Sequence, residues 1–146
     1  MYEYAGNNQE ENRQQDTLIR SLEKAINGEY SAIQCYEKLA KMAPNQKERK
    51  QILEIREDEM KHFKVFSQLY INLTGYQPIP KVTETCPNSY KAGLEFAIVD
   101  EQETVDFYLE TADDATDRSV RKAFRRAAAD EQNHAVWFLY YLVKNK

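Results

Sequence analysis

The chain contains few residues that interrupt helices. Only 4 of its 146 residues are glycine and 4 are proline, which argues against collagen-like, turn-rich and low-complexity architectures. Its abundant Glu, Lys, Arg, Gln, Ala and Leu favour helix instead. A chain of this length suits a single domain with one hydrophobic core.

The chain also lacks a basic excess and a long apolar run. Its 20 Lys and Arg residues are outnumbered by 24 Asp and Glu, for a formal net charge of −4, so we expect no nucleic-acid partner. Mean hydropathy is −0.78 and no stretch is apolar enough to span a bilayer, so we expect no membrane partner. The polar N-terminus does not resemble a signal peptide, which makes a cytoplasmic protein the expectation.

Cysteine is scarce as well. Cys35 and Cys86 form no C-x-x-C pair. Cys35 lies inside a predicted helix next to Tyr36, so we interpret it as a small buried hydrophobe. A reactive role for this thiol is the less favoured alternative.

The two histidines, in contrast, are informative. His62 and His134 each end the same phrase, D-E-x-x-H, and they lie 72 residues apart. Residues three apart on a helix share a face, so each phrase directs one carboxylate and one imidazole toward the same point.

The same offset reveals an internal repeat. When the sequence is aligned with itself at an offset of 72 residues, Glu29 aligns with Glu101 and Tyr36 aligns with Tyr108. The two D-E-x-x-H phrases also align with each other. The matches lie mostly at positions that could face a core or bind a metal. A duplicated two-helix unit explains this pattern.

Apolar residues recur at steps of three and four along four stretches, which is typical of one buried face of a helix. These stretches run from Leu22 to Ala40, Ile52 to Leu73, Leu94 to Ala112, and Val120 to Tyr141. They predict an all-α protein whose four helices form an antiparallel bundle.

The breaks between the stretches predict the topology. Pro44-Asn45 and the polar residues 113–117 are short turns, whereas glycine and three prolines mark a long connection from 75 to about 88. The bundle is therefore expected to consist of two helical hairpins joined by a long crossover. We expect a disordered tail over 1–14, where Asn, Gln and Glu dominate, and a ferritin-like four-helix bundle over 15–146.

Polar residues interrupt each apolar face near its middle. These residues are Glu29, Glu59, His62, Glu101, Glu131 and His134. The alternative is that the faces drift and all six side chains point to water. Four carboxylates in one core would repel one another unless they were protonated or bound to cations, and two divalent ions would cancel four negative charges.

The sequence therefore predicts a dinuclear site. An oxygen-rich set with two imidazoles suits iron, with manganese as the alternative, better than structural zinc. For the metal-free protein, the sequence predicts that replacing Glu59 with glutamine stabilises the fold by removing a repelling charge.

Four further residues are candidates to support these ligands. Asp58 and Asp130 precede the glutamates of the two histidine phrases, and each is expected to accept a hydrogen bond from a histidine on another helix. Tyr36 and Tyr108 lie seven residues after Glu29 and Glu101 and could bond to ligand carboxylates. The alternatives are solvated aspartates and tyrosines that simply pack with a buried hydroxyl.

This pattern, E…ExxH…E…ExxH over about residues 16–145, resembles the ferritin-like di-iron superfamily, most closely its rubrerythrin and bacterioferritin branches. The resemblance implies that Glu59 and Glu131 bridge two metals, that Glu29 and Glu101 are terminal ligands, and that His62 and His134 each bind one metal.

This sequence departs from the rubrerythrin pattern in two ways. Rubrerythrins carry an additional glutamate three residues after the third-helix ligand, where this chain has Thr104. They usually also carry a rubredoxin domain with C-x-x-C pairs, and its absence implies a separate electron donor.

By this resemblance we expect two iron ions and an oxidase- or peroxidase-type redox activity toward oxygen or peroxide. The alternative is a non-catalytic protein that binds or handles iron or manganese within a larger assembly. The 10 tyrosines, 6 phenylalanines and single tryptophan exceed what one narrow core needs, so we also expect a homodimer.

Overall fold

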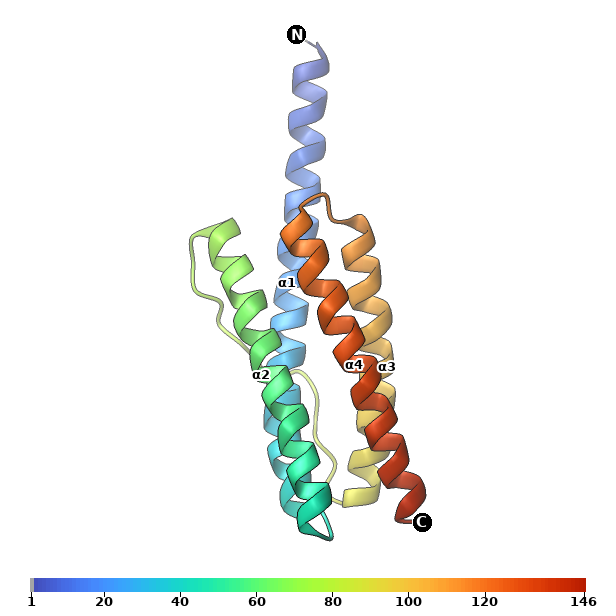
Figure 1. Ribbon diagram of the computed structural model, residues 1–146. Helices are drawn as coiled ribbons and strands as arrows, with labels where there is room; N and C mark the ends of the chain where they lie inside the picture. The colour runs from blue at the N-terminus through green and yellow to red at the C-terminus, as the bar shows by residue number, and fades with distance from the viewer. Residues whose placement is uncertain (1) are drawn as a thin grey trace.

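The computed structural model describes the backbone of residues 2–146 and the side chains of residues 8–146. It contains four helices and, over these residues, no strand (Figure 1). The helices are α1 (Tyr2–Met42), α2 (Gln46–Thr74), α3 (Tyr90–Asp114) and α4 (Arg118–Lys144). The predicted all-α four-helix bundle is confirmed. None of the described helices is long and apolar enough to cross a membrane.

Side-chain caps set the helix boundaries. Asn45, Ser89 and Asp117 precede α2, α3 and α4, and each side chain accepts a hydrogen bond from a backbone N–H of the first turn. Such caps satisfy donors that have no partner inside the helix. Gly75 ends α2 with a φ of 80°, a left-handed conformation that favours glycine.

The helices pack as two antiparallel hairpins. α1 packs against α2 and α3, and α4 packs against α3 and α2 (Figure 1). Every packed pair is antiparallel, because the chain crosses the length of the bundle between α2 and α3. This arrangement lets residues from all four helices meet at mid-height.

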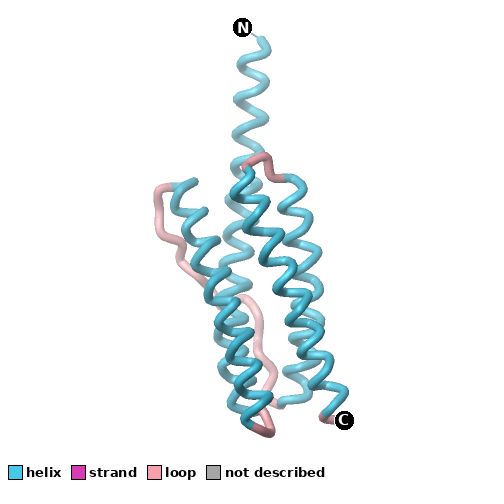
Figure 2. Tube along the Cα trace, in the orientation of Figure 1, coloured by secondary structure: helices cyan, strands magenta, loops and turns pink. Residues whose placement is uncertain are grey.

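The connection from Gly75 to Ser89, which we call the strap, runs the length of the bundle (Figure 2). It lies along α1. The backbone N–H of Lys81 donates to Asn27 Oδ1 at 2.9 Å, and that of Thr83 donates to Ser31 Oγ at 2.9 Å.

A disulfide between Cys35 and Cys86 also joins the strap to α1. Our interpretation of Cys35 as only a buried hydrophobe was therefore wrong. The side chain is buried, but its partner lies 51 residues away. The crossover brings the two cysteines together, and no local motif signals that contact.

The N-terminal part of α1 differs from the sequence-based expectation. α1 begins at Tyr2, so its start does not coincide with the predicted boundary at residue 15, and the side chains from Asn8 to Thr17 are exposed. Extending a nucleated helix costs little, and Glu, Gln and Arg are good helix formers. This part of α1 extends beyond the other three helices (Figure 1). A disordered tail over 1–14 stays a prediction, and residue 1 lies outside the described part.

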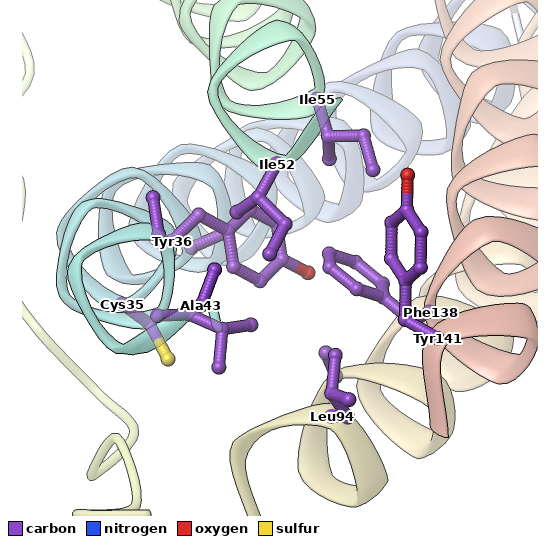
Figure 3. Close-up of a cluster of buried hydrophobic side chains, with 12 residues drawn as sticks. Cys35, Tyr36, Ala43, Ile52, Ile55, Leu94, Phe138 and Tyr141 are labelled. Atoms are coloured by element: carbon purple, nitrogen blue, oxygen red, sulfur yellow. The ribbon is translucent and has the colours of Figure 1, made fainter. Parts of the chain in front are cut away.

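Two apolar clusters fill the bundle, one on each side of a polar layer. The first, nearer the C-terminal end of α4, includes Leu39, Ile52, Leu94 and Phe138 (Figure 3). The second includes Leu22, Ile26, Phe66, Tyr108 and Phe124. The polar layer between them contains the six predicted metal-binding residues.

A buried carboxylate that the sequence did not reveal closes one end of the bundle. Glu48 is 1% exposed. Asn45 donates to its Oε2 at 2.7 Å, and Tyr90 and Asn145 donate to its Oε1 at 2.9 and 2.7 Å. These bonds tie the α1–α2 turn to the start of α3 and the end of α4.

Candidate metal centre

The six predicted ligand residues meet in the polar layer, and none is more than 6% exposed. Their ligand atoms form two groups, within each of which all atoms lie within 4.8 Å of one another. One group is Glu29, Glu59, His62 and Glu131, and the other is Glu59, Glu101, Glu131 and His134. The two groups share Glu59 and Glu131. Two metal positions side by side, with two carboxylates between them, fit this arrangement.

Each of the six side chains carries one buried atom without a hydrogen-bond partner. These atoms are Glu29 Oε2, Glu59 Oε1, His62 Nδ1, Glu101 Oε2, Glu131 Oε1 and His134 Nδ1. Leaving one such atom unpaired costs about 1–3 kcal/mol, so six at one place call for an explanation. Each histidine Nδ1 lies 3.0–3.9 Å from three glutamate oxygens without hydrogen-bond geometry. The atoms converge on shared points, as metal ligands do.

Aspartates hold the far side of both imidazoles. His62 Nε2 lies 2.8 Å from Asp130 Oδ2, and His134 Nε2 lies 2.8 Å from Asp58 Oδ2. Each bond crosses between α2 and α4. In a neutral imidazole, an Nε2–H that donates to the aspartate leaves the lone pair on Nδ1, which faces the centre.

Tyrosines make a second pair of cross-bundle bonds. The Tyr36 hydroxyl donates to Glu101 Oε1, and the Tyr108 hydroxyl donates to Glu29 Oε1. Each bond joins α1 to α3 and leaves the other carboxylate oxygen, Oε2, directed to the centre. All four predicted supporting residues therefore contact one of the six central residues, and each acts across the two hairpins.

Burial and mutual repulsion set the protonation of the carboxylates. Burial raises the pKa of Glu29 to about 8, with help from the charge of Glu59. Burial and Glu59 raise the pKa of Glu101, and burial and Glu101 raise the pKa of Glu131 well above its ordinary value. Without metal, these three carboxyls therefore take up protons more readily than exposed glutamates do.

Burial has the opposite effect on the pKa of the imidazoles, and the neighbouring glutamates overcome it. Burial alone would lower the pKa of His62, but the carboxylates of Glu29 and Glu59 outweigh it and raise it to about 11; His134 is likewise raised to about 11. Burial opposes ionisation of Glu59, yet the two histidines lower its pKa below the ordinary value. In the metal-free centre, Glu59 is thus the carboxylate that pairs with both imidazolium ions.

Asp100 is a perturbed residue that the sequence analysis missed. Burial and the neighbouring Glu84 of the strap raise the pKa of Asp100 to about 9. A signal was available, since Asp100-Glu101 repeats the Asp-Glu pairs of the two histidine phrases. Thr104, where rubrerythrins place an additional glutamate, donates to the Asp100 carbonyl at 2.7 Å and offers no carboxylate.

A groove between α2 and α4 leads from the surface to one edge of the centre. It is lined by Asp58, Lys61, Val65, Arg126, Asp130 and other residues around His62. His62 is 6% exposed, whereas His134 is 1% exposed. Of the two imidazoles, that of His62 is thus the one that lines the groove and is the more exposed.

Comparisons with known proteins agree with this geometry. The sequence model of the family described as Rubrerythrin matches residues 20–142. The uncharacterised protein YhjR of Bacillus subtilis (strain 168) is 56% identical over 132 residues, which cover 90% of this chain and 91% of that protein. A solved structure of a hypothetical protein from Pyrococcus furiosus has the same fold, with a TM-score of 0.75 over 86% of this chain and 87% of that one, at 19% identity. The family match spans the whole bundle, and the chain belongs to the rubrerythrin family.

Proposed function

We propose that this protein binds two iron ions and uses them in an oxidase- or peroxidase-type reaction with oxygen or peroxide. The observation that carries the proposal is the set of six buried, unpartnered ligand atoms. Family membership and the two overlapping ligand groups support it. Manganese is the alternative metal, because the same oxygen-rich ligand set suits both ions.

In this proposal Glu59 and Glu131, which belong to both ligand groups, would hold both metals. Glu29 and His62 complete one metal position, and Glu101 and His134 complete the other. The assignment follows the residues that the two ligand groups share. Four carboxylates cancel the charge of two divalent cations, so the loaded centre no longer needs the protons that it holds without metal.

The metals, when bound, supply the two electrons that peroxide reduction needs. The chain's own residues supply the geometry. Asp58 and Asp130 keep the imidazoles in the metal-binding tautomer, and Tyr36 and Tyr108 hold the terminal carboxylates in place. The two apolar clusters keep bulk water from the centre. The groove beside His62 admits the oxidant, and a separate electron donor restores the reduced state.

Stopped-flow mixing of the anaerobic, ferrous-loaded protein with peroxide tests this function. With excess reductant, we expect oxidation over many turnovers and loss of peroxide in proportion. Glu59→Gln, which lacks one proposed bridging carboxylate, should lose this turnover. A single stoichiometric oxidation, followed by uptake of many irons per chain, would instead identify a non-catalytic iron-handling protein in a larger assembly.

Replacing Asp130 with asparagine should weaken metal binding by about 10–100-fold. An amide can donate to Nε2, which would favour the tautomer whose Nδ1 carries the proton and cannot bind metal. Competition with a chromophoric chelator measures the affinity. Asp106→Asn, at an exposed aspartate of α3, is the matched control and should bind metal as the parent does. Equal affinities for both variants would rule out the proposed role of Asp130.

The chain should also form a homodimer through the outer face of α4. Val136, Leu139, Tyr140 and Val143 are 50–62% exposed, and their spacing places them on one stripe of the helix. A second copy that packs on this stripe would remove it from water. We expect Leu139→Glu to lower the mass measured by light scattering at micromolar concentration, and Leu109→Glu on α3 to leave it unchanged. A parent mass near 17.2 kDa would contradict the dimer.

A further inference from the structure

We propose that Cys35 and Cys86 are a redox-active pair that delivers two electrons to the metal centre. This inference rests on the proposed function. In this inference the chain itself contains the immediate electron donor of the metal centre, and a separate protein or small dithiol then reduces the disulfide again. No motif marks the pair in the sequence, because one cysteine lies in α1 and the other in the strap.

The strap holds the two sulfurs together without help from the disulfide. Asn27 and Ser31 of α1 bind the strap backbone at Lys81 and Thr83, and they lie about two turns and about one turn before Cys35, respectively. Beyond the disulfide, the Lys38 ammonium donates to the Cys86 carbonyl at 3.4 Å and also to Asn88. The strap is thus held on both sides of the disulfide.

When the disulfide is reduced, these contacts keep the thiols face to face. Such pre-organisation favours reversible opening and closing, because the two sulfurs do not have to find each other again.

The two cysteines have different environments. Cys35 is 5% exposed and belongs to the apolar cluster next to the centre. Cys86 is half-buried, and its neighbours from Lys81 to Thr85 are exposed. An external thiolate can therefore attack at Cys86 while Cys35 faces the interior. The Lys38 ammonium, which donates to the Cys86 carbonyl, adds a positive charge to this surface.

A short path connects Cys35 to the metal ligands. Cys35 is covalently followed by Tyr36, whose hydroxyl donates to Glu101 Oε1. Figure 3 shows the Cys35 sulfur and the Tyr36 ring leaving α1 in different directions, and the sulfur is bonded to Cys86 of the strap. The sulfur is thus at the strap side of α1, and the phenol is at the centre. Backbone, ring and hydrogen bond form one continuous connection between them.

The electron count of the pair matches that of the centre. Two thiols lose two electrons and two protons as the S–S bond forms. Peroxide takes up two electrons and two protons as its O–O bond breaks, and two waters leave. Bound metals would accept the two electrons of the thiols, and the two protons that the thiols release balance the two that peroxide takes up. A dithiol reductant then reopens the disulfide by thiol–disulfide exchange and is itself oxidised.

The expected cytoplasmic location is consistent with this role. Thiols there are kept reduced, and the disulfides that do form are usually catalytic or redox-sensing. A pair that cycles between thiol and disulfide fits such surroundings.

Peroxide titration of the fully reduced protein tests the inference. The ferrous-loaded chain is reduced with dithiothreitol, freed of reductant under anaerobic conditions and titrated with peroxide. The parent should consume about two equivalents per chain, one from the metals and one from the thiols, whereas Cys35→Ser should consume about one. Cys86→Ser is a second variant in case Cys35→Ser folds poorly. Alkylation followed by mass spectrometry provides an independent count of the free thiols. Peroxide should oxidise both thiols much faster in the metal-loaded parent than in the metal-free parent.

Each other outcome has a distinct meaning. Consumption of about one equivalent by both parent and cysteine variants would leave the proposed function intact and overturn the role of the cysteines. Consumption of about one equivalent by the parent and none by the variants would show that the metals do not react, and the proposed function would fail. A disulfide that resists dithiothreitol in the folded protein, or thiols that oxidise equally fast without metal, would also overturn the inference.

Discussion

Saturating ferrous or manganous ion should raise the melting temperature of the metal-free protein by at least about 15 °C. A ligand that binds only the folded state contributes about 4 kcal/mol at a thousandfold excess over its Kd, and the proposed centre has two such positions. For a domain of this size, each kcal/mol corresponds to about 2–4 °C. Burial and mutual repulsion raise the pKa of three glutamates in the metal-free centre, so metal that neutralises their charge also removes the cost of ionising them.

Thermal melts followed by circular dichroism, with chelator and with metal, measure this effect at neutral pH. The double variant Glu59→Gln, Glu131→Gln is the control, because it lacks both proposed bridging carboxylates. Its melting temperature should not respond to metal. A parent whose melting temperature is also unchanged by metal would argue against a metal centre in the polar layer.

Replacing Glu131 with glutamine and replacing Glu59 with glutamine should change the metal-free protein in opposite directions. Both variants should lose most of their metal affinity, because each lacks a proposed bridging ligand. Without metal, Glu131→Gln should be more stable than the parent, because glutamine needs no proton to be buried neutral. Glu59→Gln should be less stable, because Glu59 is the carboxylate that pairs with both imidazolium ions. The structure therefore predicts for Glu131→Gln the stabilisation that the sequence predicted for Glu59→Gln.

The pH dependence of these differences follows from the direction of each pKa shift. Glu131 has a raised pKa in the folded state, so it destabilises the fold at pH values above the unfolded-state pKa of about 4.3. The advantage of Glu131→Gln should thus vanish below about pH 4 and grow toward neutral pH. Glu59 has a lowered pKa, so its contribution is present above about pH 4.3 and is lost as the pH falls through the folded-state pKa. The deficit of Glu59→Gln should shrink in acid.

Urea unfolding of the two chelator-treated variants and the parent, at neutral pH, near pH 4 and at the lowest pH at which the parent stays folded, checks both signs. If both variants shift in the same direction at neutral pH, the pairing of Glu59 with the histidines is not as the structure shows it. If the shifts are opposite but do not depend on pH, side-chain packing and not charge would be their cause.

The helices and the central residues could be predicted from the sequence because their signals are local and repeated. Each helix buries one face, so its apolar residues recur every three or four positions. A buried ionisable residue then stands out as an interruption, as Glu29 and Glu101 do at the same offset of 72 residues. The bundle geometry brings these interruptions to one level, since each lies near the middle of the buried face of its helix.

The supporting contacts were predictable only in part. The chemistry of imidazole indicates that His62 and His134 need acceptors, and Asp58 and Asp130 are nearby in sequence. That each aspartate serves the histidine of the other hairpin depends on the packing of α2 against α4. The same holds for Tyr36 and its bond to Glu101 across the bundle.

Other features depend on contacts that leave no mark in the sequence. Cys86 reaches Cys35 only because the strap follows α1. From the sequence, Glu48 is expected to be a surface residue at the start of a helix. Its hydrogen-bond partners Tyr90 and Asn145 lie in α3 and just after α4. Such pairings link segments 42 and 97 residues apart, and helical periodicity contains no information about them.

A crystal structure of the protein soaked in ferrous or manganous ion, with anomalous scattering recorded at the metal edge, tests the central claim most directly. Two anomalous peaks per chain, about 3.5–4 Å apart, should lie between Glu59 and Glu131, with the imidazole Nδ1 of His62 bound to one metal and that of His134 bound to the other. The absence of peaks in this layer from a well-ordered, metal-soaked crystal would contradict it, as would any of the six side chains turned to bulk water.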